Sequence, residues 1–315
     1  MLLCLLAHSQ EAESTGSGAE LTIIPNLELV PSYSTPDKAF GFGLGNSSIY
    51  TLFEGSASEH FSWTVANHWL SLSDTDDLGW LYRGTGYSDT TNWLDYFKAD
   101  LTFGNWTFTL GKDMILTGGF EFDEWDWDLP ANLTTPLWNY LPTYQWGASV
   151  AYTLPSECST FLAQISTSPA GLHPFSSGLK QFSAMWKSEF GWLSTIWSAS
   201  ALEVEKGAYN WLFVLGQRGT FGDWSVTLDY TNMAASEDFN HTVHATVANS
   251  PSDKLDWAAK FIWCPTGWIA GAHMDWFPLK ESRDLRLRAA LSYDKFNEGI
   301  ALNIGVCYNL RFRLW

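Results

Sequence analysis

The final stretch of the chain, 300–314, shows the clearest alternation of hydrophobic and polar positions. Its even-numbered residues, from Ile300 to Leu314, are apolar or aromatic, and the residues between them are small, polar or basic. Strand side chains point alternately to two faces, so this segment has one apolar face and one wet face. A run of about fifteen residues is long for a soluble strand and natural for a tilted strand through an outer membrane. The alternative is an unusually long edge strand of a soluble sheet.

The same two-residue period recurs along the rest of the chain. Leu285 and Leu287, for example, oppose Arg286 and Arg288. A slip of one residue would place such arginines in lipid at about 2–4 kcal/mol each near the midplane, so the register is well specified. Only the facing of 192–203 stays unassigned. The predicted strands are 20–30, 47–57, 61–72, 93–103, one from 106, 144–154, 159–166, 179–190, 192–203, 209–221, 224–233, 241–249, 254–263, 268–277, 284–295 and 300–314.

These segments predict an all-β fold, a transmembrane antiparallel up-and-down β-barrel of about sixteen strands, between about 14 and 18. Joints after even-numbered strands are mostly short and several after odd-numbered ones are long, as expected for periplasmic turns and external loops. Two hairpins, Phe103-Gly104-Asn105-Trp106 and Phe221-Gly222-Asp223-Trp224, place aromatic residues on both sides of a glycine turn, and Phe190-Gly191-Trp192 is a shorter version. They predict an aromatic girdle at one end of the barrel.

Composition narrows the possibilities further. No stretch has 18 consecutive apolar residues, which excludes membrane-spanning helices. Aromatic residues make up 16% of the chain, with 19 Trp, a residue that favours membrane–water boundaries. The net charge of -17 argues against nucleic acid as a partner and is compatible with a cation-attracting pore. The four cysteines show no metal-binding spacing and no disulfide framework, and we expect no cofactor and no metal.

The chain divides into a short leader and one domain. Residues 1–9 are interpreted as the remnant of a signal peptide, because 2–7 is apolar and Ala7-His8-Ser9 has a small-x-small pattern. The alternative is a disordered N-terminus. Residues 10–19 are polar and rich in Ser and Gly, which predicts a flexible segment, and 20–315 is predicted to form the outer-membrane barrel.

A closed barrel of about sixteen strands encloses a water-filled lumen unless something plugs it. The longest connection, 117–143, carries five carboxylates within eight residues. Inside a barrel they would form a negative constriction that favours cations. The alternatives are a solvated external loop and, less favoured, a metal site without EF-hand spacing. The predicted constriction residues are Glu121, Asp123, Glu124, Asp126 and Asp128.

Two further groups of residues belong to this hypothesis. Trp125 and Trp127 could stack on sugar rings or anchor the loop to the wall. The four arginines of the last two strands are expected to cluster near the periplasmic end, either as a basic wall opposite the acidic loop or in ordinary ion pairs. The charges predicted to line the lumen are Glu54, Lys98, Asp100, Lys260, Asp275, Arg286, Arg288, Arg311 and Arg313.

The turn order, the aromatic hairpins and the Gly111-Lys112 strand end leading into Gly118-Gly119-Phe120-Glu121 resemble bacterial outer-membrane porins, most of all the loose group related to phosphate-selective porins O and P. The resemblance implies a sixteen-stranded barrel, passive diffusion of small hydrophilic solutes or ions, often a homotrimer, and a third loop folded inward. Phosphate selectivity is not expected, because the loop lacks basic residues. Outer-membrane lipid and lipopolysaccharide are the expected surroundings.

Two other classes remain open. A barrel lipid hydrolase would need a Ser/His pair at the lipid boundary, for which His244 and His273 are candidates, with His273 and Asp275 on one strand face. No nucleophile motif accompanies them, so we expect no enzymatic activity. The other class is a soluble, Trp-rich carbohydrate-binding β-protein.

Overall fold

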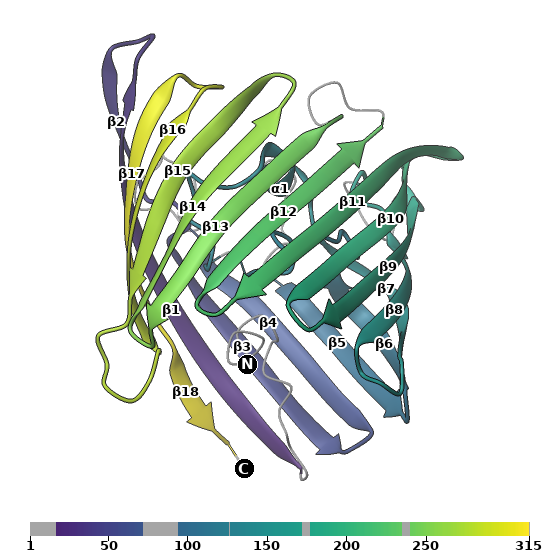
Figure 1. Ribbon diagram of the computed structural model, residues 1–315. Coiled ribbons are helices and arrows are strands. Elements are labelled where there is room, and N and C mark those ends of the chain that lie inside the picture. Colours follow the sequence, from purple (N-terminus) through teal and green to yellow (C-terminus); the bar gives the residue numbers. More distant parts are fainter. Residues whose placement is uncertain (1–16, 72–93, 126, 172–176, 235–239, 315) are drawn as a thin grey trace.

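A computed structural model describes residues 17–71, 94–125, 127–171, 177–234 and 240–314, which form one closed antiparallel sheet around a lumen (Figure 1). A short helix, α1 (Pro136–Tyr140), lies between β6 and β7. The strands are β1 (Gly18–Ser34), β2 (Ala39–Gly43), β3 (Ser48–Ser58), β4 (Phe61–Ser71), β5 (Leu94–Phe103), β6 (Trp106–Met114), β7 (Tyr144–Thr153), β8 (Ser159–Thr167), β9 (Lys180–Phe190), β10 (Leu193–Glu205), β11 (Ala208–Phe221), β12 (Trp224–Met233), β13 (Thr242–Ser252), β14 (Leu255–Cys264), β15 (Gly267–Trp276), β16 (Leu285–Asp294), β17 (Gly299–Tyr308) and β18 (Leu310–Arg313).

The eighteen strand segments form the sixteen strands of the barrel, because two of these strands consist of two segments each. We call each complete barrel strand a stave. Both β2 and β3 pair with β1, so they are two parts of one stave. Likewise β17 and β18 both pair with the other edge of β1, which closes the barrel. The predicted fold class and strand count are confirmed. The first stave is longer than predicted, because its pairing with β2 extends it from 30 to Ser34.

Two prolines interrupt the pairing of β1 with the last stave, and the first of them, Pro25, coincides with the break at Asn309. The register pairs Ile23 with Leu310 and then Asn26 with Cys307, so the ladder is interrupted where Pro25 lies on β1. A second interruption of the same seam falls at Pro31. Proline has no backbone N–H to donate, and both prolines have the same parity along β1. The facing ladder to β3 is continuous through Pro25, so the missing donors are those directed at the last stave.

The outer surface carries the predicted apolar face. On the last stave Leu302, Ile304 and Phe312 are 37–49% exposed, whereas their neighbour Asn303 is fully buried on the inside. The same alternation settles 192–203, where Trp197 points outward and Ser198 is buried on the lumen side. An apolar outer surface on a closed barrel belongs in lipid and argues against the soluble alternatives.

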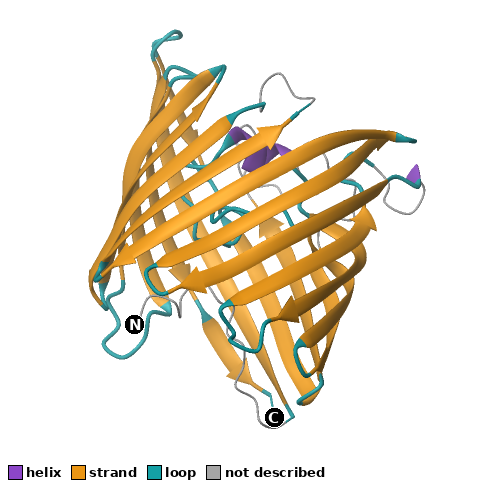
Figure 2. Ribbon diagram, turned by 45° about the vertical axis from the view of Figure 1, so that its right-hand side comes forward, coloured by secondary structure: helices purple, strands orange, loops and turns teal. Residues whose placement is uncertain are grey.

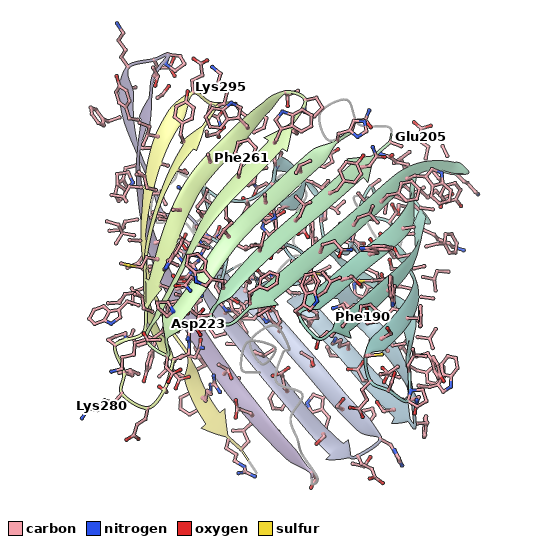
Figure 3. All side chains as sticks on the ribbon, in the orientation of Figure 1. Phe190, Glu205, Asp223, Phe261, Lys280 and Lys295 are labelled. Atoms are coloured by element: carbon pink, nitrogen blue, oxygen red, sulfur yellow. The ribbon has the colours of Figure 1, made fainter. Side chains whose placement is uncertain are left out.

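The two rims differ, and we name them after their connections. At the turn rim, two-residue turns such as Gly104–Asn105 join the strands, and the rings of the three aromatic hairpins lie exposed beside them. Phe190 and Asp223 lie at this rim in Figure 3, and Glu205 and Lys295 lie at the other, the loop rim. The loop rim carries the long connections, although β10–β11 and β14–β15 also join tightly there.

Candidate functional site

The connection from β6 to β7, residues 115–143, lies inside the barrel, with α1 near the loop rim (Figure 2). Its apolar residues Ile115, Phe122 and Leu137 pack against Leu202 and Leu212 of the inner wall in a buried cluster. A second cluster joins Leu133 to Ile262 of β14 and Ile269 of β15. Apolar contacts on different sides of the lumen hold this loop across its cross-section.

The start of the loop docks on β10 and β12 through its backbone. Asp229 Oδ2 accepts hydrogen bonds from the N–H groups of Phe120 at 2.8 Å and Glu121 at 3.0 Å. Gly118 and Gly119 both have φ of 77°, a conformation that favours glycine. A Cβ on Gly118 would lie 2.5 Å from Ser198 Oγ, so close approach to the wall also requires glycine there.

Glu121 does not face an aqueous passage. Its side chain is 2% exposed, and its carboxylate accepts hydrogen bonds from the Thr135 N–H at 2.8 Å and the Thr135 hydroxyl at 2.5 Å. Burial raises the pKa of Glu121 above its ordinary value, and the nearby His244 opposes that rise. Glu121 therefore holds the returning part of the loop to its start.

Three other loop carboxylates form ion pairs with the wall. Asp123 pairs with Lys187 of β9. Glu124 Oε1 lies 3.3 Å from Arg218 Nη2 of β11, and its Oε2 lies 3.9 Å from Lys260 Nζ of β14. The fifth predicted constriction residue, Asp126, lies outside the described residues.

The third of these carboxylates, Asp128, pairs with the wall at β16. Its Oδ1 is 2.5 Å from Arg286 Nη1. Arg286 also donates to the Trp127 carbonyl, as does Arg288 at 3.4 Å. Arg288 is held in turn by two 2.7 Å hydrogen bonds to Asp275. Arg288 is therefore buried and Arg286 largely covered under the loop, and Asp275 is neutralised on the wall.

The four arginines do not form the predicted cluster. Arg286 and Arg288 contact the loop. Arg311 instead pairs, at 3.2 Å, with Asp284, the residue directly before β16. Arg313 is exposed near the turn rim and opposes Glu20 in register. The arginines are spread along the barrel axis because β18 extends toward the turn rim past the level at which β16 begins.

On the wall formed by β1–β6, some of the carboxylates form no ion pair. Glu54 of β3 lies directly opposite Glu20 of β1, and within the described part of the chain neither has a basic residue at ion-pair distance. Lys98 pairs with Asp113 at 3.4 Å, and Asp100 accepts a hydrogen bond from a threonine hydroxyl of β6. This wall therefore keeps an excess of negative charge toward the turn rim.

The loop tryptophans pack on each other and on the wall. The Trp125 and Trp127 rings are stacked, with centroids 4.7 Å apart and an interplanar angle of 11°. Tyr50 of β3 lies 4.7 Å from Trp127, and Tyr96 of β5 lies 5.4 Å from Trp125. Trp127 is 9% exposed. The arrangement favours the wall anchor over the sugar platform.

The two histidines have partners that bear on the hydrolase alternative. His244 Nε2 lies 2.8 Å from the hydroxyl of Thr246, and Nδ1 lies 3.6 Å from Asp229. That carboxylate is already bound by the loop, and His244 is 4% exposed beneath it. Asp275 accepts two hydrogen bonds from Arg288, and His273 Nδ1 is buried without a hydrogen-bond partner among the described residues, so Asp275 does not hold that nitrogen. No group of three or more His, Cys, Asp or Glu suited to a metal occurs among the described residues.

Sequence reasoning missed the wall partners of the loop, which are Lys187, Arg218 and Asp229, and also the buried carboxylate of Glu28. Each lies on the lumen face of its strand, so the period-two pattern could have placed it inside. Glu28 is 1% exposed and joins Asn303 of β17 at 2.9 Å to the Asn46 N–H at 2.8 Å.

Solved structures share this fold. OmpT, an outer membrane protein of Vibrio cholerae in its trimer form, gives a TM-score of 0.57 at 13% identity, covering 93% of this chain and 99% of that chain. A mutant of the porin of Rh. blastica gives 0.59 at 11% identity, covering 92% of this chain and 100% of that chain. No family model and no curated protein matches the sequence. The fold is thus that of bacterial outer-membrane barrels of the porin type. Within the described residues, no helix has the length and hydrophobicity needed to cross a membrane.

Proposed function

We propose that this protein is a porin of the bacterial outer membrane that gives passive, cation-preferring diffusion of small hydrophilic solutes. The observation that carries the proposal is a closed sixteen-stave barrel, apolar outside, whose polar lumen is crossed by one inward loop. Barrels of this strand number enclose an aqueous channel. The loop 117–143, with Glu121, Asp123, Glu124, Asp126 and Asp128, forms the constriction.

The preference for cations is supported by the charge of the chain and by one wall. The net charge is -17, and Glu20, Glu54 and Asp100 lie on the lumen face of β1–β5. Fixed carboxylates beside an aqueous path raise the local concentration of cations. The same lumen is lined by seven other charged residues, which are Lys98, Lys260, Asp275, Arg286, Arg288, Arg311 and Arg313.

The proposed surroundings follow from the outer surface. The apolar belt contacts outer-membrane lipid, and the loop rim lies at the level of lipopolysaccharide. A homotrimer is proposed from the resemblance, and OmpT of Vibrio cholerae is described in a trimer form. Placement near the phosphate-selective O and P group rests on the sequence resemblance. We propose no enzymatic activity and no cofactor.

Conductance in a planar bilayer tests the proposal. Refolded protein is expected to insert as discrete open channels, with a reversal potential in a salt gradient that shows preference for cations. Loss of the heat-modifiable folded band on a detergent gel after boiling would report the barrel in the same sample. Folded protein without channels would refute the porin proposal, and a preference for anions would refute the charge assignment. Phospholipid hydrolysis by the folded protein would favour the enzyme instead.

A further inference from the structure

The loop carboxylates are distributed over three separate sectors of the wall. Asp123 reaches β9, Glu124 reaches β11 and β14, and Asp128 reaches β16. We propose that Asp123, Glu124 and Asp128 are positioning residues that clamp the loop, and that they are not the charges that select cations. The inference rests on the proposed function only where conductance is its readout.

The middle contact is oriented from both sides. On the wall, Arg218 Nε donates to Thr227 Oγ1 at 2.9 Å, and on the loop the ring centroid of Phe120 lies 4.1 Å from the guanidinium. These two contacts fix the orientation in which the guanidinium meets Glu124. Side-chain entropy is the main cost of an ion pair near water, and this anchoring reduces it.

The β16 contact is oriented in a similar way. Asp275 holds Arg288 through two hydrogen bonds of 2.7 Å, and Arg286 and Arg288 both donate to the Trp127 carbonyl. Arg286 is thereby aligned with Asp128, which follows directly in the chain. A backbone acceptor between two guanidinium groups fixes the loop more tightly than an ion pair alone.

Pairing also removes the long-range field of the loop carboxylates. An ion in the lumen meets a carboxylate and its base as a dipole, and the field of a dipole falls faster with distance than that of a single charge. Salt screens what remains over about 8–10 Å. Glu54 and Glu20 form no such close ion pair among the described residues, although Lys98 lies near Glu54 and Arg313 lies opposite Glu20, so the charge of that wall is less fully neutralised by direct contact.

Exchange of charges across one pair tests the inference. The variants are Asp123→Lys, Lys187→Asp and the double exchange, which leaves the charge of the lumen unchanged. Each single variant places two like charges together, so the loop should loosen, with noisier and larger channels and with amides of 117–125 exchanging about two- to fivefold faster. The double exchange should restore both the conductance and the slow hydrogen exchange.

Matched controls separate this outcome from general instability. Lys295 pairs with Glu298 at the loop rim, away from the inner loop, and Lys295→Asp should leave exchange of 117–125 unchanged. Where a charge-reversed variant does not refold, Asp123→Asn and Lys187→Gln replace it, with smaller loosening of the same sign.

Two outcomes would overturn the clamp. One is that amide exchange of 117–125 stays at the wild-type rate in both single variants. The other is that the double exchange shows the summed effects of the singles and no recovery. Absence of channels in the folded wild-type protein would instead refute the porin proposal, and hydrogen exchange would still decide the clamp.

Discussion

The two sides of the lumen carry similar side chains and use them differently. On the wall of β9–β16, each described basic residue that reaches the loop meets a loop carboxylate or carbonyl, and these charges hold the inner loop against the wall. On the wall of β1–β5, Glu20 and Glu54 lie opposite each other and form no ion pair within the described part of the chain, although Arg313 lies opposite Glu20 and Lys98 lies near Glu54. The comparison teaches that an acidic segment does not make an acidic pore, because the electrostatic effect of a carboxylate depends on its partners.

The largest effect is expected from Asp229→Ala on the wall of β9–β16, which contacts the inner loop. The change leaves the Phe120 and Glu121 N–H groups without their acceptor, at about 1–3 kcal/mol for each buried group left unpaired. The loop should leave its seat, so single-channel conductance should rise and become noisy. Asp229→Asn keeps an acceptor oxygen and should stay near the wild-type conductance. Equal conductance in both variants would show that Asp229 does not seat the loop.

On the wall of β1–β5, Glu20→Gln and Glu54→Gln should change ion selectivity and leave the pore size unchanged. Each removes a lumen carboxylate that forms no ion pair in the described part of the chain, so the reversal potential in a salt gradient should move toward zero, and further in the double variant. Removal of the like-charge contact should also stabilise the barrel by about 0.2–1 kcal/mol, measured as a higher temperature for loss of the folded band. The comparison fails if Asp123→Asn and Glu124→Gln shift the reversal potential more than these two.

The smallest effect is expected for the pH dependence of loop stability, which depends on Glu121. Because the pKa of Glu121 is raised in the folded protein, its contribution to stability is fully present below the unfolded pKa and is lost as pH rises through the folded pKa. Glu121→Gln stays neutral, so at neutral pH it should protect the 117–125 amides from exchange better than wild type does. The difference should disappear in mild acid. A variant less protected than wild type at both pH values would contradict the raised pKa.

Sequence alone was sufficient for the barrel, since lipid and water on opposite sides of one sheet impose the two-residue period. Leu291 and Ser292, exposed and buried respectively, follow that rule without knowledge of any partner. The loop contacts do not follow from it. Asp128 and Arg286 are separated by 158 positions, and Asp229 and Phe120 by 109. Which inner side chain meets which loop atom depends on the path of an irregular segment, and no periodicity encodes that path.

The prolines of β1 have a consequence for how the cylinder is completed. Pro25 and Pro31 withhold donors from the junction between the first and last staves, so a newly inserted chain joins its two ends with fewer backbone bonds there than elsewhere. The Glu28–Asn303 bond crosses that junction from inside, and Asn132 of the inner loop reaches Ser292 and the Ala301 carbonyl beside it. The inner loop thus contacts the last stave beside its closing junction, and a chain that lost the Glu28–Asn303 bond would separate more easily along this one line.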